Sequence, residues 1–319
     1  MYIFKKLKPR YKILLLTSMM ALFAVSCNEV FEQDIAGKSV SIISPADGYS
    51  SPSNQVVFWW NKLDGADWYN LQIVKPSFSN VQTLVVDTNV VGESFSWLLS
   101  FGEYEWRIRP ENSAYIGNYV VRSFSVESDS DLTYQVVPLT SPLQYDTTNN
   151  LNQSFSWQSI PYTESYTFTI WQNAYGGTTE HSSSVTTNNA NYTFVTDGAY
   201  EWGVKAVNAL TSSIYYTRKI YIDTQSPATP VLLLPAEDDT LTTTSITFSW
   251  THSSGGSSIT DSLLVSDDNG FANIVFSTAT KASEVTTILS TGIYYWTVKS
   301  VDAAGNESSY SSYRTVTIE

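Results

Sequence analysis

The chain has 319 residues, of which 42% are hydrophobic, 14% aromatic and only 15% charged, a composition that allows two or three domains and favours β-structure. The formal net charge is −13, and from Cys27 onward 12 basic residues stand against 30 acidic ones. An acidic surface of this kind excludes nucleic acid as an expected partner, and it also excludes docking on anionic lipid through basic residues.

Residues 1–26 are predicted to be a secretion signal. A basic segment, residues 5–12, precedes an apolar run of 12 residues at 13–24, which is shorter than the about 20 residues needed to span a bilayer. The sequence Ala24-Val-Ser-Cys27 resembles the lipobox of bacterial lipoproteins, with Ala at the position where Leu is usual. The resemblance implies cleavage before Cys27, acylation of Cys27, and outer-membrane lipid as the partner of the acylated residue.

Residues 27–38 are predicted to be an acidic tether. Glu29, Glu32 and Asp34 follow the cysteine closely, and short acidic stretches there resemble the surface-export signals of some Gram-negative lipoproteins; a solvated linker is the alternative. We therefore expect a lipid-anchored outer-membrane protein on the cell surface, with a periplasm-facing orientation left open. Cys27 is the only cysteine, so no intrachain disulfide is expected.

An internal repeat of about 95 residues dominates the rest of the chain. Tryptophan landmarks recur in one order, with a Pro motif before them: Ser44-Pro45, Ser141-Pro142 and Leu234-Pro235, then Phe58-Trp-Trp60, Phe155-Ser-Trp157 and Phe248-Ser-Trp250, then Trp106, Trp202 and Trp296. The repeat predicts three modules, at residues 39–127, 128–224 and 225–319.

Alternation of apolar and polar residues predicts strands with one buried face. In Gly198-Ala-Tyr-Glu-Trp-Gly-Val-Lys-Ala-Val-Asn208, for example, Tyr200, Trp202 and Val204 share one face. Some seven such strands in about 95 residues are typical of an immunoglobulin-like sandwich. The fold class is therefore predicted to be all-β, with three tandem β-sandwich modules after a lipoprotein signal peptide.

The modules resemble the fibronectin type III family. The family carries a Trp at the end of its second strand and a Tyr-x-aliphatic-x-Val-x-Ala strand, which Tyr200-Glu-Trp-Gly-Val-Lys-Ala206 matches except for its Trp; module 1 has Pro110 in place of the final Ala. The resemblance implies that Tyr104, Tyr200 and Tyr294 form tyrosine corners, with plain core aromatics as the alternative. The expected core consists of Trp60, Tyr104, Trp106, Trp157, Tyr200, Trp202, Trp250, Tyr294 and Trp296.

Catalytic patterns are absent from the sequence. The two histidines, His181 and His252, lie in different modules, and His181 is expected in a solvated loop. Asp267-Asp268-Asn269 and Asp302 to Glu307 are rich in the oxygen ligands that calcium prefers, but such side chains usually cap their own turns. We therefore predict no enzyme activity, no cofactor and no metal site.

Four tryptophans stand outside the repeated core pairs: Trp59, Trp68, Trp97 and Trp171. Alternation directs Trp59 and Trp171 outward, so the four are candidate ligand-binding aromatics, with packing under loops as the alternative. The leading hypothesis is a non-enzymatic spacer or protein-interaction arm. The alternatives are a polysaccharide-binding surface lipoprotein and an accessory subunit of a surface hydrolase.

Overall fold

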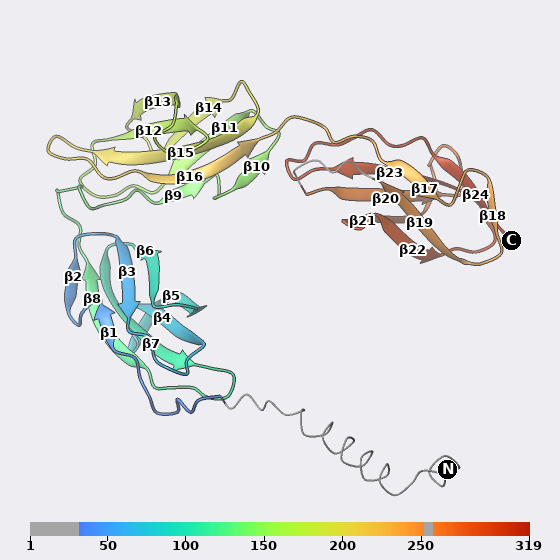
Figure 1. Ribbon diagram of the computed structural model, residues 1–319. Helices are drawn as coiled ribbons and strands as arrows, with labels where there is room; N and C mark the ends of the chain where they lie inside the picture. Colours follow the sequence, from blue (N-terminus) through green and yellow to red (C-terminus); the bar gives the residue numbers. More distant parts are fainter. Residues whose placement is uncertain (1–31, 252–257) are drawn as a thin grey trace, which may run out of the picture. The chain divides into compact units, whose positions relative to one another are not determined.

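The computed structural model describes residues 32–251 and 258–319 (Figure 1). The predicted signal peptide, Cys27 and His252 lie outside these residues. The chain divides into two compact units, Met1–Glu127 and Ser128–Glu319. The first unit contains one β-sandwich and the second contains two, so the predicted all-β fold of three sandwich modules is confirmed. Nowhere in the described ranges is there a helix long and apolar enough to cross a membrane.

Module 1 is a sandwich of a three-stranded and a five-stranded sheet. The small sheet has the order β1-β3-β6 and the large sheet the order β2-β8-β7-β4-β5. The strands are β1 (Ile42–Ser44), β2 (Tyr49–Ser51), β3 (Gln55–Trp60), β4 (Trp68–Ser77), β5 (Asn80–Val90), β6 (Ser94–Leu98), β7 (Gly102–Glu111) and β8 (Val120–Val126).

Module 2 repeats this order. Its small sheet is β14-β11-β9 and its large sheet is β10-β16-β15-β12-β13. The strands are β9 (Leu139–Ser141), β10 (Asp146–Thr148), β11 (Asn152–Trp157), β12 (Ser165–Gln172), β13 (Thr179–Val185), β14 (Asn189–Thr193), β15 (Gly198–Val207) and β16 (Tyr216–Ile222).

Module 3 repeats it again, with a small sheet β17-β19-β22 and a large sheet β18-β24-β23-β20-β21. The strands are β17 (Val231–Leu234), β18 (Asp239–Leu241), β19 (Ser245–Thr251), β20 (Thr260–Ser266), β21 (Ile274–Thr280), β22 (Glu284–Ile288), β23 (Gly292–Val301) and β24 (Arg314–Ile318).

Each module has eight strands where about seven were expected, because the first extended segment is split between the sheets. In module 1, β1 pairs with β3 in the small sheet, and after the cis peptide bond at Ser44-Pro45 the chain crosses to the large sheet. There β2 pairs in parallel with β8, with Tyr49 opposite Phe124. Modules 2 and 3 make the same crossing at Pro142 and Pro235.

The core of each module is built from aromatic rings on the facing sheets. All nine aromatic residues expected in the core are buried, the most exposed being Tyr294 at 7%. In each module the landmark Trp of the large sheet contacts the landmark Phe of the small sheet, with ring centroids 4.9 Å apart for Trp106–Phe58, 4.9 Å for Trp202–Phe155 and 5.1 Å for Trp296–Phe248. These distances lie in the range of favourable aromatic pairs.

A tyrosine corner occurs in all three modules. The hydroxyl of a buried Tyr donates to the backbone carbonyl four residues earlier, which joins the loop before the strand to the strand itself. The pairs are Tyr104 with Ser100 at 2.6 Å, Tyr200 with Thr196 at 2.9 Å and Tyr294 with Ser290 at 3.1 Å.

The predicted tether needs a correction where it meets module 1. Residues 32–38 are not a free linker, because Ile35 is fully buried and the amide of Asn112 donates to the carbonyl of Gln33 at 2.9 Å. Asn112 also donates to Gly65 O at 2.7 Å. One buried side-chain amide therefore fastens the incoming segment to a loop of the sandwich, and a solvated tether is left only as an expectation for residues 27–31.

The same asparagine arrangement recurs at the entry to the other modules. Asn208 Nδ2 donates to Ser130 O at 2.9 Å, and Asn306 Nδ2 donates to Asp223 O at 2.8 Å. In module 3 two residues make the hydrogen bonds that one Asn makes in modules 1 and 2. Asn306 donates to the incoming segment, and Asp302 Oδ1 accepts the backbone N–H groups of the turn, as the Asn side-chain oxygen does in the other modules. The segment before each module is thus held by its own sandwich.

Candidate binding surfaces on the outer faces of the modules

Two of the four candidate tryptophans are exposed, but on different faces of one sheet. Trp59 on β3 is 48% exposed on the outer face of the small sheet of module 1, beside Val57. Trp97 on β6 is 43% exposed and pairs with the buried Val56, so it lies on the core side of an edge strand. Its indole stacks on Phe95 at 5.6 Å. Trp59 and Trp97 do not form one surface.

The other two tryptophans are partly or wholly covered. Trp68 on β4 is half-buried and its Nε1 donates to Glu111 Oε2 at 2.9 Å. The exposure expected for Trp171 is wrong: it points off the outer face of the large sheet of module 2, as alternation indicates, but is only 6% exposed. Tyr175 and Tyr215 cover it edge-on, with ring centroids at 4.9 Å and 5.1 Å. The alternative, packing under loops, holds for this residue.

Trp171 belongs to an aromatic cluster that has a counterpart in every module. Each cluster lies on the outer face of the large sheet, over the residue that follows the core Trp. One aromatic comes from the turn after the fourth strand of the module and one Tyr directly precedes the last strand: Phe78 and Tyr119 in module 1, Tyr175 and Tyr215 in module 2, Phe271 and Tyr313 in module 3.

In module 1 the space between the two aromatics holds a guanidinium. The Cζ atom of Arg107 lies 4.3 Å from the ring centroid of Phe78 and 4.2 Å from that of Tyr119. Arg109 also lies over Tyr119, at 4.5 Å, and Arg107 Nε donates to Gln72 Oε1 at 2.8 Å. The cluster is therefore closed by cation–π contacts made within the module.

In module 2 the space holds the indole of Trp171. Gly203 occupies the position of Arg107, and a Cβ there would lie 2.7 Å from Thr217 and 3.3 Å from the Trp171 ring. A larger residue at position 203 would therefore collide with the neighbouring strand, at Thr217 and at the carbonyl of Tyr216 2.9 Å away, and would also press on the indole. Burial raises the pKa of the Tyr215 hydroxyl, which is hydrogen-bonded with Thr169 Oγ1 at 3.0 Å.

In module 3 the corresponding space is open. Thr297 takes the position of Arg107, and a hollow of about 210 Å³ lies above it. The rings of Phe271, Tyr310 and Tyr313 frame the hollow, and Tyr310 and Tyr313 are 45% and 44% exposed. This is the one cluster of the three whose centre no side chain of the chain fills, among the residues that the structure describes.

Sequence reasoning missed these clusters because their aromatics come from loops, where alternation gives no signal. The signal that could have found them is positional. The residue after the core Trp of each large sheet, namely Arg107, Gly203 and Thr297, is never a large apolar residue.

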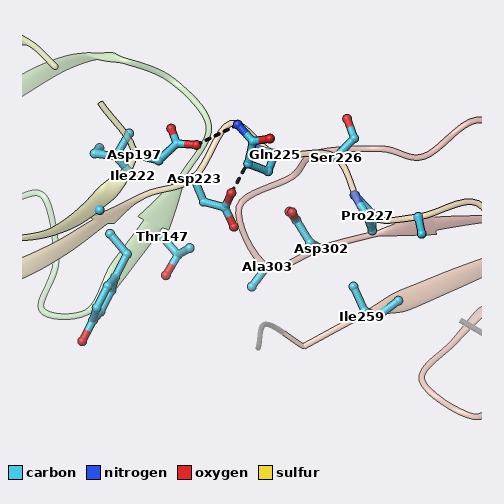
Figure 2. Close-up of a pocket in the computed structure, with 13 residues that line it drawn as sticks. Thr147, Asp197, Ile222, Asp223, Gln225, Ser226, Pro227, Ile259, Asp302 and Ala303 are labelled. Atoms are coloured by element: carbon cyan, nitrogen blue, oxygen red, sulfur yellow. Dashed lines mark hydrogen bonds between the residues drawn. The ribbon is translucent and has the colours of Figure 1, made fainter. Parts of the chain in front are cut away.

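A larger cavity, of about 740 Å³, lies in the second compact unit where module 2 meets module 3 (Figure 2). Several polar groups in its lining are hydrogen-bonded to one another. Gln225 donates to Asp197 through Nε2 at 3.2 Å and to Asp223 through its backbone N–H at 3.0 Å. Desolvation raises the pKa of Asp197, but hydrogen bonds from Gln225 and Thr224 outweigh this effect and hold the pKa below its usual value. These carboxylates hold Thr224 and Gln225 of the joint in place.

The acidic turns considered for calcium serve their own backbones. Asp268 accepts backbone N–H groups from Gly270, Ala272 and Asn273 at 2.7 to 3.2 Å. These hydrogen bonds lower its pKa. Within residues 32–251 and 258–319, no group of three or more His, Cys, Asp or Glu side chains is placed to hold a metal ion.

His181 lies in β13 and not in the loop that was expected. Its ring packs on Tyr192 at 4.9 Å and on Phe168 at 5.8 Å, and Nε2 is hydrogen-bonded with Ser183 Oγ at 3.2 Å. The imidazole is therefore part of the packing at the edge of module 2. No catalytic domain is identified in the described part of the chain.

Comparison with known proteins gives structural likeness only. No family model matches the chain, and neither does any curated protein. The solved structures that resemble it include the fibronectin(III)-like modules of Clostridium thermocellum CbhA (16% identity, TM-score 0.39, 57% of this chain and 94% of that one), the chicken CNTN1 FN1-FN3 domains (17%, 0.39, 88% and 97%) and titin domains A168-A170 (13%, 0.38, 88% and 98%). The strand order described above is what defines three tandem fibronectin type III-like β-sandwich modules here.

Proposed function

We propose that this protein is a non-enzymatic, lipid-anchored component of the outer membrane, displayed on the cell surface, whose three modules act as a spacer and protein-interaction arm. The anchor is the acylated Cys27 inferred from the lipobox-like sequence. The observation that supports the arm is the tandem repetition of one sandwich whose outer-face cluster differs in each copy, being filled in modules 1 and 2 and open in module 3. Repetition supplies length, and variation of the cluster supplies different contacts.

The test is capture of a partner in intact cell envelopes. Photo-reactive residues placed at exposed positions such as Tyr115, Leu210 and Ile293 would be cross-linked in the envelope, and the products identified by mass spectrometry. The proposal predicts one recurrent membrane-protein partner. Turnover of a substrate by the purified chain would contradict it.

Polysaccharide binding is the second candidate, and the exposure of Trp59 supports it. An indole that is about half exposed on a sheet face, next to exposed Val57 and Ile43, is an apolar surface on which a sugar ring could stack. Retardation in polysaccharide-containing gels tests this candidate. Trp59→Ala should abolish the retardation while the exposed Trp97→Ala, on the other face of the sheet, serves as the matched control.

A further inference from the structure

The hollow over Thr297 has an internal precedent. In module 1 the same place, one residue after the core Trp of the large sheet, is filled by the planar cation of Arg107 between two rings. In module 3 the side chain that follows Trp296 is short, and three rings border about 210 Å³ of open space. Module 1 thus carries its own planar group between the rings, whereas module 3 has open space at the same position.

We propose that the hollow of module 3 binds the guanidinium of an arginine side chain presented by a partner protein. The inference rests on the proposed function as an interaction arm, and it names the contact and the chemistry of the partner.

The lining of the hollow favours this occupant over a sugar. The two hydroxyls at the base of the hollow, those of Thr297 and Ser311, already make hydrogen bonds within the module. Thr297 Oγ1 donates to Ser311 O at 2.8 Å, and Ser311 Oγ accepts from Val298 N at 3.2 Å. A pyranose would find few polar partners at the base of the site. A guanidinium needs few there, since its faces are weakly hydrated and stack on aromatic rings while its edges stay in water.

Charge favours a cation as well. Residues 225–319 contain ten acidic and three basic residues. Lys299 lies over the Tyr310 ring at 5.4 Å, but its Nζ is 2.7 Å from Glu307 Oε2, so its charge is paired. The negative field of the module attracts an arginine and steers it toward the rings.

The turn that carries Phe271 is already ordered. Phe271 has a φ of +56°, and the backbone N–H groups on both sides of it, those of Gly270 and Ala272, bond to Asp268 Oδ1. Phe271 also contacts Tyr313 with ring centroids 6.1 Å apart, and Tyr313 contacts Tyr295 at 5.6 Å. The aromatic frame is therefore built before any ligand arrives, which lowers the entropic cost of binding.

Nuclear magnetic resonance of the mature full-length chain, with ¹³C-labelled Tyr rings, tests the proposal. The probes are N-acetyl-arginine amide, N-acetyl-lysine amide at matched ionic strength, N-acetyl-tryptophan amide and a neutral glucan oligosaccharide. The proposal predicts saturable shifts of the Tyr310 and Tyr313 signals with the arginine probe, at least fivefold larger than with the lysine probe. Equal responses to arginine and lysine, or a response only to tryptophan or the glucan, would overturn it.

Two variants show whether the response belongs to the hollow. Thr297→Arg fills the space from within, as Arg107 does in module 1, and should reduce the response at least tenfold. Because Thr297 is buried, the exposed Tyr310→Ala provides a second variant with the same expected loss at the Tyr313 signal. Tyr175→Ala, in the filled cluster of module 2, is the control that should leave the response unchanged.

The cross-linking experiment separates this proposal from the function on which it rests. If Thr297→Arg and Tyr310→Ala capture the membrane partner as well as the wild type does, the arginine site is wrong and the interaction arm stands. If the wild type captures no protein, the interaction arm is wrong whatever the arginine probe does.

Discussion

The indole nitrogen of Trp250 donates a hydrogen bond of 2.6 Å to Oδ2 of Asp261 inside the core of module 3. Asp261 is fully buried, and it also accepts from the hydroxyl of Ser300. In modules 1 and 2 a Tyr takes the position of Asp261 and packs edge-on against the corresponding Trp, whose Nε1 has no hydrogen bond. Module 3 thus replaces an aromatic contact by a polar one.

Asp261→Ala should destabilise module 3 by about 1–3 kcal/mol or more, because it leaves a buried indole N–H and a buried hydroxyl without their partner. The measurement is the free energy of unfolding in urea. The double variant Asp261→Tyr with Ser300→Ala recreates the pairing of Tyr166 with Ala206 in module 2 and should lose less. Equal losses for the two variants would show that the carboxylate hydrogen bonds are not what matters.

Trp202→Ala should unfold module 2 and leave the other two modules folded. The side chain is fully buried between Phe155 and Phe168. Truncating a buried Trp costs about 3–5 kcal/mol, a large share of a domain stability of about 5–15 kcal/mol. Calorimetry of the full chain should show one transition lowered or lost. The exposed Trp59→Ala is the control, and a melt like that of the wild type for Trp202→Ala contradicts the account.

Asn208→Ala should loosen the segment that enters module 2. The side-chain amide donates to Ser130 O and Tyr162 O, and its oxygen accepts from the backbone N–H groups of Leu210 and Thr211. Hydrogen exchange in residues 128–137, measured by mass spectrometry, should become faster. Asn191→Ala, which removes one exposed hydrogen bond with Ser154, is the control. Unchanged exchange would mean that buried Val136 and Val137 hold the segment alone.

Tyr192 should make module 2 sensitive to strongly alkaline pH. Burial raises the pKa of Tyr192, and so does the carboxylate of Glu180, which accepts a hydrogen bond of 2.8 Å from the Tyr192 hydroxyl. Together they bring the pKa to about 12. Because the pKa of an unfolded Tyr is about 10, the folded state holds the proton more tightly. The stabilisation is complete below about pH 10 and is lost as the pH rises through about 12.

The measurement compares the free energy of unfolding of the wild type and Tyr192→Phe from pH 9 to 12. The difference between them should shrink as the pH rises, and the absorbance of Tyr192 should titrate late. Tyr175→Phe, at a residue more than half exposed, should show no such convergence. A constant difference for Tyr192→Phe across the range would refute the assignment.

The sandwich core could be predicted because its residues follow the period of a strand. Trp106, Trp202 and Trp296 recur at one spacing, and burying them decides which face of each strand points inward. The eighth strand could not be predicted. The strands in question, β2, β10 and β18, have only three residues each, and each pairs with the last strand of its module, far away in the sequence.

Strand alternation missed the outer-face clusters for a different reason. Alternation correctly directs Trp171 away from the core, but it does not reveal that Tyr175 and Tyr215 come from two loops to cover the indole. Exposure is decided by these long-range contacts. For the same reason the hollow of module 3 could not be read from Phe271 and Tyr313, which are 42 positions apart in the sequence.

The mass of the N-terminal tryptic peptide, measured on protein isolated from cell envelopes, tests whether acylated Cys27 attaches the arm to the membrane. The proposed anchor predicts a peptide that begins at Cys27, ends at Lys38 and carries a lipid modification on the cysteine. A peptide that retains Ser26, or an unmodified Cys27 thiol, would contradict it.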